Sequence, residues 1–202
     1  MTETHRGRPL GFDPDQALYE LMLLFWEHGY DATTQTDMVT RTGLSSSSLY
    51  NTFGDKPAIF DRVLERYNAM TVTGCEPLMT GTDGLAELEA LVERVHEHVA
   101  QPEDMPAGCL ITASMGELAG REPDISLRAD EYRTIMRDAF AVAIDRAVTC
   151  GDLEPGDTAA RSALLLAAYL GTLTTDKSSA DPADAMAMVE GMRQLLESWH
   201  PR

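Results

Sequence analysis

Residues 29–60 read GYDATTQTDMVTRTGLSSSSLYNTFGDKPAIF, and this stretch decides the fold of the first part of the chain. Its apolar residues recur at helical spacing on both sides of Gly43, which predicts two short helices joined by a glycine turn. Helices this short are not stable alone, so they must pack on neighbours. The core residues that we expect in them are Met38, Val39, Leu44, Leu49 and Phe53.

A longer helix precedes this pair. Asp13 followed by Pro14 and Gln16 is typical of a helix start, with an N-cap, a first-turn proline and a capping-box partner. Gly29 is expected to end this helix. One apolar stripe along it consists of Ala17, Leu18, Leu21, Leu24 and Phe25.

The order helix, short helix, glycine turn, short helix is that of a helix-turn-helix. Ser45 is placed to cap the last helix, whose residues Leu49 and Phe53 face inward. The outward residues, whose hydroxyls and amide suit base edges and phosphates, are then Ser46, Ser47, Tyr50 and Asn51.

The whole stretch from Gly11 to Phe60 resembles the N-terminal domain of the TetR family of transcriptional repressors. The resembling residues are GY at 29–30, ATT at 32–34, DM at 37–38, GLS at 43–45 and LYNTFGDKPAIF at 49–60. The chain departs from the family pattern at Val39 and Thr42, where alanine is common, and in its serine run. These departures leave the operator sequence open.

The resemblance implies DNA-contacting roles for three residues. The residue matching Tyr50 contacts the DNA backbone in the family, and those matching Thr34 and Lys56 meet phosphates at helix N-termini, where main-chain amides favour anions. Together with the outward serines and the basic residues of this region, the expected DNA-binding set is Arg6, Arg8, Thr34, Arg41, Ser45, Ser46, Ser47, Tyr50, Asn51 and Lys56.

Charge limits how this region can hold DNA. The 202 residues carry a net charge of −17, and residues 1–60 hold four cations against eight carboxylates, a net −4. Attraction must therefore be local, with few phosphate contacts and a shallow salt dependence. Arg6-Gly7-Arg8-Pro9 resembles a minor-groove AT-hook within a flexible arm over residues 1–11, although a solvated tail is the alternative.

The rest of the chain also reads as helical, and the predicted fold class is all-α. We expect a helix after Asp55 to about Thr73 and a loop over residues 74–84. Further helices are expected over 85–99, 108–120, 123–150, 158–173 and 183–199. The longest, 123–150, shows a recurring apolar face of Leu127, Ile135, Met136, Phe140 and Ile144.

The resemblance divides the chain into a DNA-binding domain over residues 12–57 and a larger domain over 58–202 that binds a small molecule and pairs two copies. The last two helices support pairing into a homodimer, although their apolar faces can also fill the protomer's own core. Those faces consist of Ala163, Leu166, Ala167 and Leu170 and of Met188, Met192, Leu195, Leu196 and Trp199.

Polar, sulfur-bearing and aromatic residues of the middle helices are candidates for a ligand pocket, or else ordinary core. They are Met70, His96, Met105, Cys109, Met115, Tyr132, Met136 and Phe140. Cys109 follows Gly108 at a helix start, where the helix dipole can favour the reactive thiolate. A similar GCL signature marks a subset of TetR relatives, so Cys109 is either an electrophile or oxidant switch or a buried apolar residue.

Other functions find less support. Glu93-x-x-His96 and Glu197-x-x-His200 match the ligand pairs of di-metal helical enzymes, but the second pair adjoins the C-terminal Pro201. No GxSxG, Walker or GxGxxG pattern occurs, so we expect neither catalysis nor a cofactor. A third interpretation keeps the same fold but excludes DNA binding: the protein would be an acidic helical dimer that binds only a small molecule or a protein partner.

Three scattered cysteines without a CxxC pair, and no apolar run long enough for a signal peptide or a membrane span, favour a cytoplasmic protein. The expected function is a ligand-responsive repressor, released by a small molecule from a palindromic double-stranded operator. The sequence names neither effector nor operator, and it does not separate repression from activation.

Overall fold

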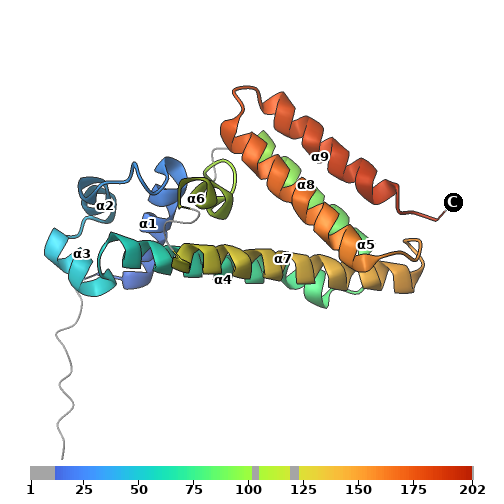
Figure 1. The fold of residues 1–202 in the computed structure, drawn as a ribbon, viewed down its shortest axis with the longest axis horizontal. Helices are drawn as coiled ribbons and strands as arrows, with labels where there is room; N and C mark the ends of the chain where they lie inside the picture. The colour runs from blue at the N-terminus through green and yellow to red at the C-terminus, as the bar shows by residue number, and fades with distance from the viewer. Residues whose placement is uncertain (1–11, 102–104, 119–122, 202) are drawn as a thin grey trace, which may run out of the picture.

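A computed structural model describes residues 12–101, 105–118 and 123–201, with the side chains of 123 and 124 left out. Within these ranges the chain forms nine helices and no strand, which confirms the all-α class. The first three helices gather at one end of an elongated molecule, as Figure 1 shows. They are α1 (Pro14–His28), α2 (Gln35–Thr42) and α3 (Ser46–Phe53).

The turns between these helices form as their residues predict. Asp13 caps α1 by accepting from the amides of Asp15 and Gln16, and Gly29 ends that helix at a φ of 82°. The Gln16 side chain, however, donates to Glu20 and does not close a capping box. Gly43 ends α2 in the left-handed region at a φ of 68°, a conformation that glycine adopts at little cost.

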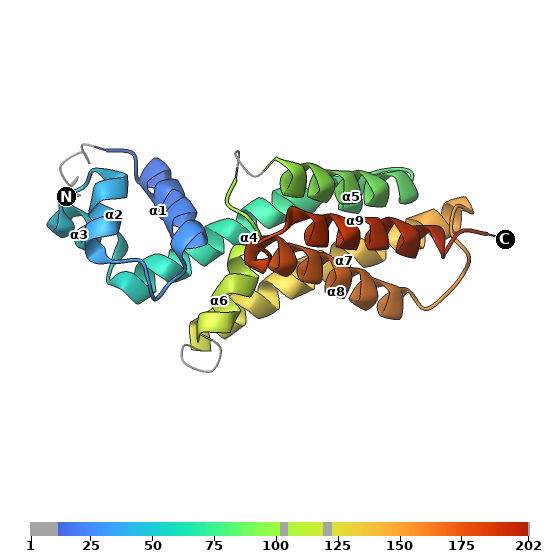
Figure 2. The same cartoon turned by 90° about the horizontal axis from the view of Figure 1, so that it is seen from above.

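Two long helices form the base of the molecule. α4 (Lys56–Thr80) and α7 (Pro123–Cys150) run side by side along its length (Figures 1 and 2). The predicted end of α4 near Thr73 is wrong, because the helix continues through Pro77 to Gly81. Turn-forming residues were overridden there by burial of Cys75 and Leu78.

The C-terminal end of α4 is further stabilised by α7. Arg146 donates to the main-chain carbonyls of Leu78 at 3.2 Å and Met79 at 2.9 Å, which have no partner within a helix that stops at Thr80. Residues 74–80 of the expected loop are therefore the last two turns of this helix, whereas residues 81–84 do form the connection to α5.

The other helices cover this pair. α8 (Thr158–Ser178) and α9 (Pro182–Glu197) pack on each other and slant away from the base, and α8 and α5 (Leu85–Ala100) both pack on α7. The short α6 (Leu110–Leu118) lies toward the first three helices (Figures 1 and 2). α8 extends one turn beyond the predicted Leu173 because Ser179, not the earlier polar residues, ends it.

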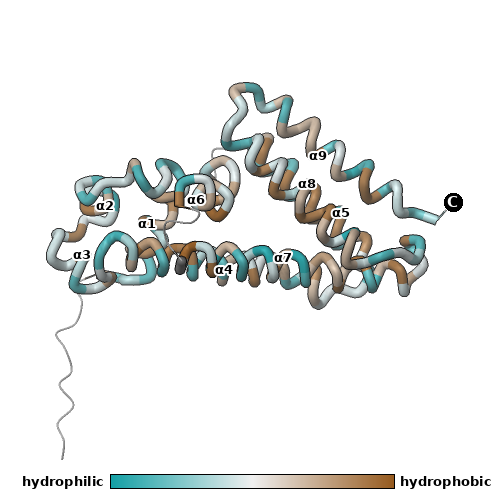
Figure 3. Tube along the Cα trace, in the orientation of Figure 1, coloured by the Kyte–Doolittle hydropathy of each residue, from teal (hydrophilic) through white to brown (hydrophobic). Residues whose placement is uncertain are grey.

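Hydrophobic residues recur along α4, α7 and α8, as the hydropathy colouring in Figure 3 shows, and the buried ones among the described residues form one core. Leu127 was expected in this core but is 56% exposed. The buried stripe of α7 begins at Ile125 and continues through Ala129 and Tyr132, and Leu127 lies about 200° around the helix from Ile125. Within the described ranges, no helix has both the length and the apolar character needed to cross a membrane.

Candidate DNA-contacting surface and ligand cavity

The start of α3 presents a cluster of hydroxyl groups. Ser45 accepts from the amide of Ser48 at 3.2 Å, and its Oγ lies 3.1 Å from that of Ser47. Ser45 and Ser47 are exposed, as is Asn51 one turn further along, while Ser46 and Tyr50 are half-buried. α3 lies at the end of the molecule remote from α9, where a long polymer can approach it (Figures 1 and 2).

The start of α2 is fixed by a reciprocal pair. The hydroxyl of Thr34 donates to Asp37 at 2.6 Å, while the amide of Asp37 donates back at 3.2 Å. Hydrogen bonds from the hydroxyl and the main-chain amide of Thr34 hold the pKa of the Asp37 carboxyl below its ordinary value. Thr34 is exposed, and its position at the helix start leaves first-turn amides of α2 free to face an anion.

The two described cations of residues 12–60 are held differently. The guanidinium of Arg41 is bound by two carboxylates of α1, Glu20 at 3.0 Å and Glu27 at 3.0 Å. Lys56, at the start of α4, lies over the ring of Tyr30 with 4.4 Å to its centroid, and no carboxylate of this range pairs with it. Arg6 and Arg8 lie outside the described residues.

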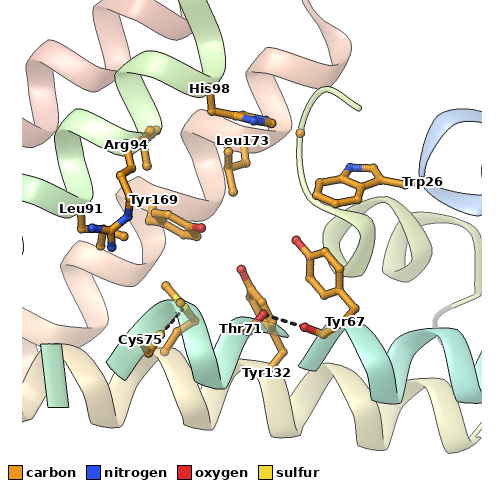
Figure 4. A pocket seen from close by; sticks show the side chains of 14 residues that line it. Trp26, Tyr67, Thr71, Cys75, Leu91, Arg94, His98, Tyr132, Tyr169 and Leu173 are labelled. Atoms are coloured by element: carbon orange, nitrogen blue, oxygen red, sulfur yellow. Dashed lines mark hydrogen bonds between the residues drawn. The ribbon is translucent and has the colours of Figure 1, made fainter. Parts of the chain in front are cut away.

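A cavity of about 200 Å³ opens among the helices of the larger part of the molecule. Figure 4 shows its side chains, which come from α4, α5, α7 and α8, together with Trp26 from α1. The lining residues are Trp26, Tyr67, Thr71, Gly74, Cys75, Leu91, Arg94, Val95, His98, Gly108, Tyr132, Met136, Tyr169 and Leu173.

Burial sets the protonation of the groups around this cavity. It raises the pKa of the phenols of Tyr67, Tyr132 and Tyr169, so all three remain O–H donors at neutral pH. Burial also raises the pKa of the Cys75 thiol, which lies 3.6 Å from the sulfur of Met136. The cavity is therefore largely aromatic, with neutral phenol donors beside the charged Arg94.

The structure places few of the expected ligand residues in the cavity. Tyr132 and Met136 line it, and Cys109 lies directly behind Tyr67, whose hydroxyl is 3.4 Å from its sulfur. Met105 instead contacts the hydroxyl of Tyr19, and it lines a neighbouring pocket. Phe140 packs on the far side of Tyr169, with 6.2 Å between ring centroids.

The remaining three expected ligand residues lie elsewhere. Met70 is 38% exposed on α4, His96 lies 3.3 Å from Glu93, and the sulfur of Met115 accepts from Arg133. Sequence reasoning missed Trp26 and Tyr169, because neither belongs to the apolar stripe identified in its helix and the periodic pattern carries no other sign of a pocket.

Besides the packing of α1 on α4, hydrogen bonds from α6 and α8 join the larger part of the molecule to the first three helices. Lys177 on α8 donates to the carbonyls of Trp26 and Glu27, which end α1. Glu117 on α6 accepts from the amide of Asp31 at 2.9 Å, directly after that helix. The position of α1 is thus set by its packing on α4 together with these hydrogen bonds from α6 and α8.

The metal-ligand pairs noted in the sequence do not converge. In the parts of the chain that the structure describes, no group of three or more His, Cys, Asp or Glu side chains is arranged to hold a metal ion. Glu93 is instead paired with Arg193 at 2.6 Å.

The helical arrangement defines, over the described residues, an all-α protein of the helix-turn-helix class. The family model "Bacterial regulatory proteins, tetR family" matches residues 22–63, and "Tetracyclin repressor-like, C-terminal domain" matches residues 84–192. The second match alone covers more than half of the chain, and this protein belongs to the TetR family.

Named relatives agree with this assignment. The HTH-type transcriptional repressor ComR of Escherichia coli (strain K12) is 34% identical over 126 residues, which cover 60% of this chain and 58% of ComR. The HTH-type transcriptional repressor BdcR of the same strain is 39% identical over 61 residues, or 30% of this chain and 31% of BdcR. The chain thus spans less than two thirds of either relative.

Solved structures show the same fold over nearly the whole chain. A TetR family transcriptional regulator from Agrobacterium tumefaciens superposes with a TM-score of 0.81 at 19% identity, covering 93% of this chain and 97% of the other. CifR, solved as a cysteine mutant with 26 bp double-strand operator DNA, superposes with a TM-score of 0.75 at 24% identity, covering 95% and 100%.

Proposed function

We propose that this protein is a homodimeric transcriptional repressor that binds a palindromic DNA operator and leaves it when a small molecule fills the cavity. The single observation that carries this proposal is that Trp26 belongs to the DNA-binding helices and also lines the cavity. A ligand there contacts both parts of the protein at once. The named repressor relatives and the DNA-bound structure of CifR support this function.

The proposed division falls at the start of α4. Residues 12–57 form the DNA-binding unit, preceded by the arm over residues 1–11, and residues 58–202 form the ligand-binding and dimerisation unit. α3 enters the major groove with Ser46, Ser47 and Asn51, while Thr34, Ser45, Tyr50 and Lys56 hold the DNA backbone. Arg41, with both carboxylate partners on α1, serves mainly to hold α2 in place.

Dimerisation uses the face of α8 and α9 that the protomer leaves uncovered. Leu166, Met192 and Leu196 of the expected faces are buried within the protomer, whereas Ala163 and Ala167 are exposed. Leu164 beside them is 52% exposed. Small residues around one large apolar side chain allow two α8 helices to approach closely across a two-fold axis.

Release follows from linkage between two sites. A ligand shifts the balance between conformations only by its differential affinity for them. A ligand that displaces Trp26 moves α1, and with it α2 and α3, whose spacing in the dimer must match roughly 34–36 Å, one turn of DNA. An electrophile acting at Cys109 is a further route, because Tyr67 connects that thiol to the cavity.

The proposal places the protein in the cytoplasm with its DNA and requires no catalysis. Selection of bound fragments from a random or genomic DNA pool, at stated salt and with reductant, tests it directly. An enriched near-palindrome whose half-sites are spaced for a dimer is the expected result. Recovery of no sequence by a folded dimer at low salt would contradict it and favour an acidic dimer that binds only a small molecule or protein partner.

A further inference from the structure

The cavity carries a charge preference opposite to that of the whole protein. The chain has 33 acidic residues and a net charge of −17, yet none of the lining residues is Asp or Glu. Arg94 and His98 line it instead. A cationic ligand finds no counter-charge in these walls, whereas an anionic one does.

Arg94, a solvent-exposed side chain of α5, lines the cavity on one side. Its positive charge is close enough to Tyr169 to oppose, as a smaller effect, the rise in the pKa of that phenol. Among the described residues, no carboxylate lies within ion-pair distance of its guanidinium, in contrast to Arg41, Arg128 and Arg193. A planar guanidinium without a partner matches a carboxylate in a two-bond fork.

The other end holds a buried indole N–H that has no acceptor. Trp26 is 7% exposed, and in the described part of the chain its Nε1 is buried and makes no hydrogen bond, whereas the buried His98 Nε2 lies 3.5 Å from Asp176. Figure 4 shows the Trp26 ring on the side of the cavity away from Arg94, with the His98 ring between them. A buried N–H without an acceptor is unfavourable, so a ligand oxygen at this end is stabilised.

One carboxylate lies behind this end. Asp176 is 3.5 Å from His98 Nε2, but it accepts from the amide of Gly108 at 2.7 Å and does not line the cavity. It therefore holds His98 and the start of the α6 segment, and it leaves the indole N–H of Trp26 available to a ligand.

The walls between the two ends are aromatic. Trp26 and Tyr67 meet edge to face with centroids 5.1 Å apart, and Tyr67 and Tyr132 lie 5.9 Å apart. Such rings favour another ring placed edge-on or offset. A volume of about 200 Å³ suits a single ring with small substituents, since a cavity of about 150 Å³ can hold benzene.

We infer that the cavity binds a monocyclic aromatic carboxylate that carries a second oxygen on its ring. The carboxylate pairs with Arg94, the ring lies among Tyr67, Tyr132 and Tyr169, and the second oxygen accepts from Trp26 Nε1. This inference rests on the proposed function, because it names the ligand class of the same cavity.

The test measures direct binding to the full-length protein by calorimetry, without DNA. The probes are 4-hydroxybenzoate, its neutral amide 4-hydroxybenzamide, benzoate, which lacks the second oxygen, and cyclohexanecarboxylate, which lacks the aromatic ring. We expect 4-hydroxybenzoate to bind at least about tenfold more tightly than each of the other three, in line with a charged or buried hydrogen bond. Equal affinity for the acid and its amide would overturn the inference.

Matched variants locate the contacts. Arg94→Gln should remove the preference for acid over amide, whereas Arg137→Gln, the loss of an exposed arginine elsewhere, should keep it. Trp26→Phe keeps an aromatic ring but lacks the N–H, so it should abolish the advantage of 4-hydroxybenzoate over benzoate. The inference would also be overturned if Arg94→Gln kept the preference for acid over amide and Trp26→Phe kept the preference for 4-hydroxybenzoate over benzoate.

Fluorescence gives a second readout from the same variants. The chain has two tryptophans, so Trp199→Phe leaves Trp26 as the sole reporter and Trp26→Phe leaves Trp199. Ligand should change the emission of the first variant and not that of the second. A change confined to Trp199 would place the ligand outside this cavity.

Failure of this inference is distinct from failure of the proposed function. Recovery of a palindromic operator with no binding of the acids leaves the repressor standing and removes this ligand class. Binding of the acid without recovery of an operator supports this ligand class and contradicts the repressor function.

Discussion

Lys177 on α8 donates from its ammonium group to the main-chain carbonyl of Trp26 at 2.9 Å, at the end of α1. The same Trp26 places its indole in the wall of the cavity. One residue of the DNA-binding helices is therefore held through its main chain by α8 and is open to ligand through its side chain. This arrangement gives a short physical connection between the cavity and the DNA-contacting surface.

Replacement of Lys177 by Met should loosen this connection. The carbonyls of Trp26 and Glu27 lose a charged donor at a helix C-terminus, where cations are favourable. We expect unfolding in urea to show a loss of about 1 kcal/mol and operator affinity to fall severalfold, because α1 is less firmly oriented. Ser178→Ala, the next residue along α8, is the control; equal effects in the two variants would contradict a specific role for Lys177.

Lys56 should contribute one phosphate contact to DNA binding. Lys56→Gln should lower operator affinity at low salt and reduce the slope of log K against log salt by about one. Tyr50→Phe should weaken binding through loss of one hydroxyl. Fluorescence anisotropy with a labelled operator at several salt concentrations measures both, and an unaltered slope in Lys56→Gln would show that this cation does not contact phosphate.

Arg41, unlike Lys56, should contribute to the stability of the fold and not to the salt dependence of DNA binding. Its guanidinium is shared by Glu20 and Glu27 with about a third of each side chain exposed, so Arg41→Gln removes a packing contact between α1 and α2. We expect a loss of stability of up to about 1 kcal/mol and an unchanged salt slope. A slope that falls as in Lys56→Gln would instead place Arg41 on the DNA.

The sequence predicts the DNA-binding helices better than the cavity. Asp13, Thr34, Ser45 and Gly43 act locally, through caps and turns that a few neighbouring residues determine, and the structure forms each of them. The end of α4 is missed because Pro77 and its neighbours favour a turn locally, while contacts with α7 keep the helix going.

The cavity depends on residues far apart in the chain. Trp26, Tyr67 and Tyr169 belong to three different helices, and each has the spacing of an ordinary core residue. Which core positions face a space depends on how the helices cross, and a periodic pattern does not contain that information. Tyr132 and Met136 were identified because residue type alone suited a pocket.

Two glycines with positive φ should respond differently to alanine. At Gly84, with φ +89°, a Cβ would lie 2.5 Å from the carbonyl oxygen of Ala143 and 2.5 Å from the nitrogen of Ala147. At Gly43, with φ +68°, it would meet nothing within 4 Å. We expect Gly43→Ala to cost about 1 kcal/mol for its backbone conformation and Gly84→Ala to cost at least about 2 kcal/mol more in chemical denaturation, because α5 must move away from α7. Equal losses would show that α5 shifts without cost.

The three cysteines should differ sharply in reactivity. Cys150 is exposed, whereas Cys75 and Cys109 are buried, and burial raises the pKa of the Cys75 thiol so that less thiolate is present at neutral pH. A chromogenic disulfide reagent added to native protein should therefore modify one thiol rapidly and the other two only slowly. Cys150→Ser should abolish the rapid phase, and its persistence in that variant would place a reactive thiol elsewhere.

Cys109 can then be tested in the Cys150→Ser background. Cys109 is 1% exposed, and the hydroxyl of Tyr67 separates it from the cavity, so an electrophile reaches it only when that ring moves. If Cys109 is a switch, N-ethylmaleimide should release the Cys150→Ser variant from its operator. Adding Cys109→Ser should prevent that release and leave the operator affinity without reagent unchanged. Release that continues in Cys109→Ser would assign Cys109 to the core, because the electrophile would then act at Cys75 or at another group.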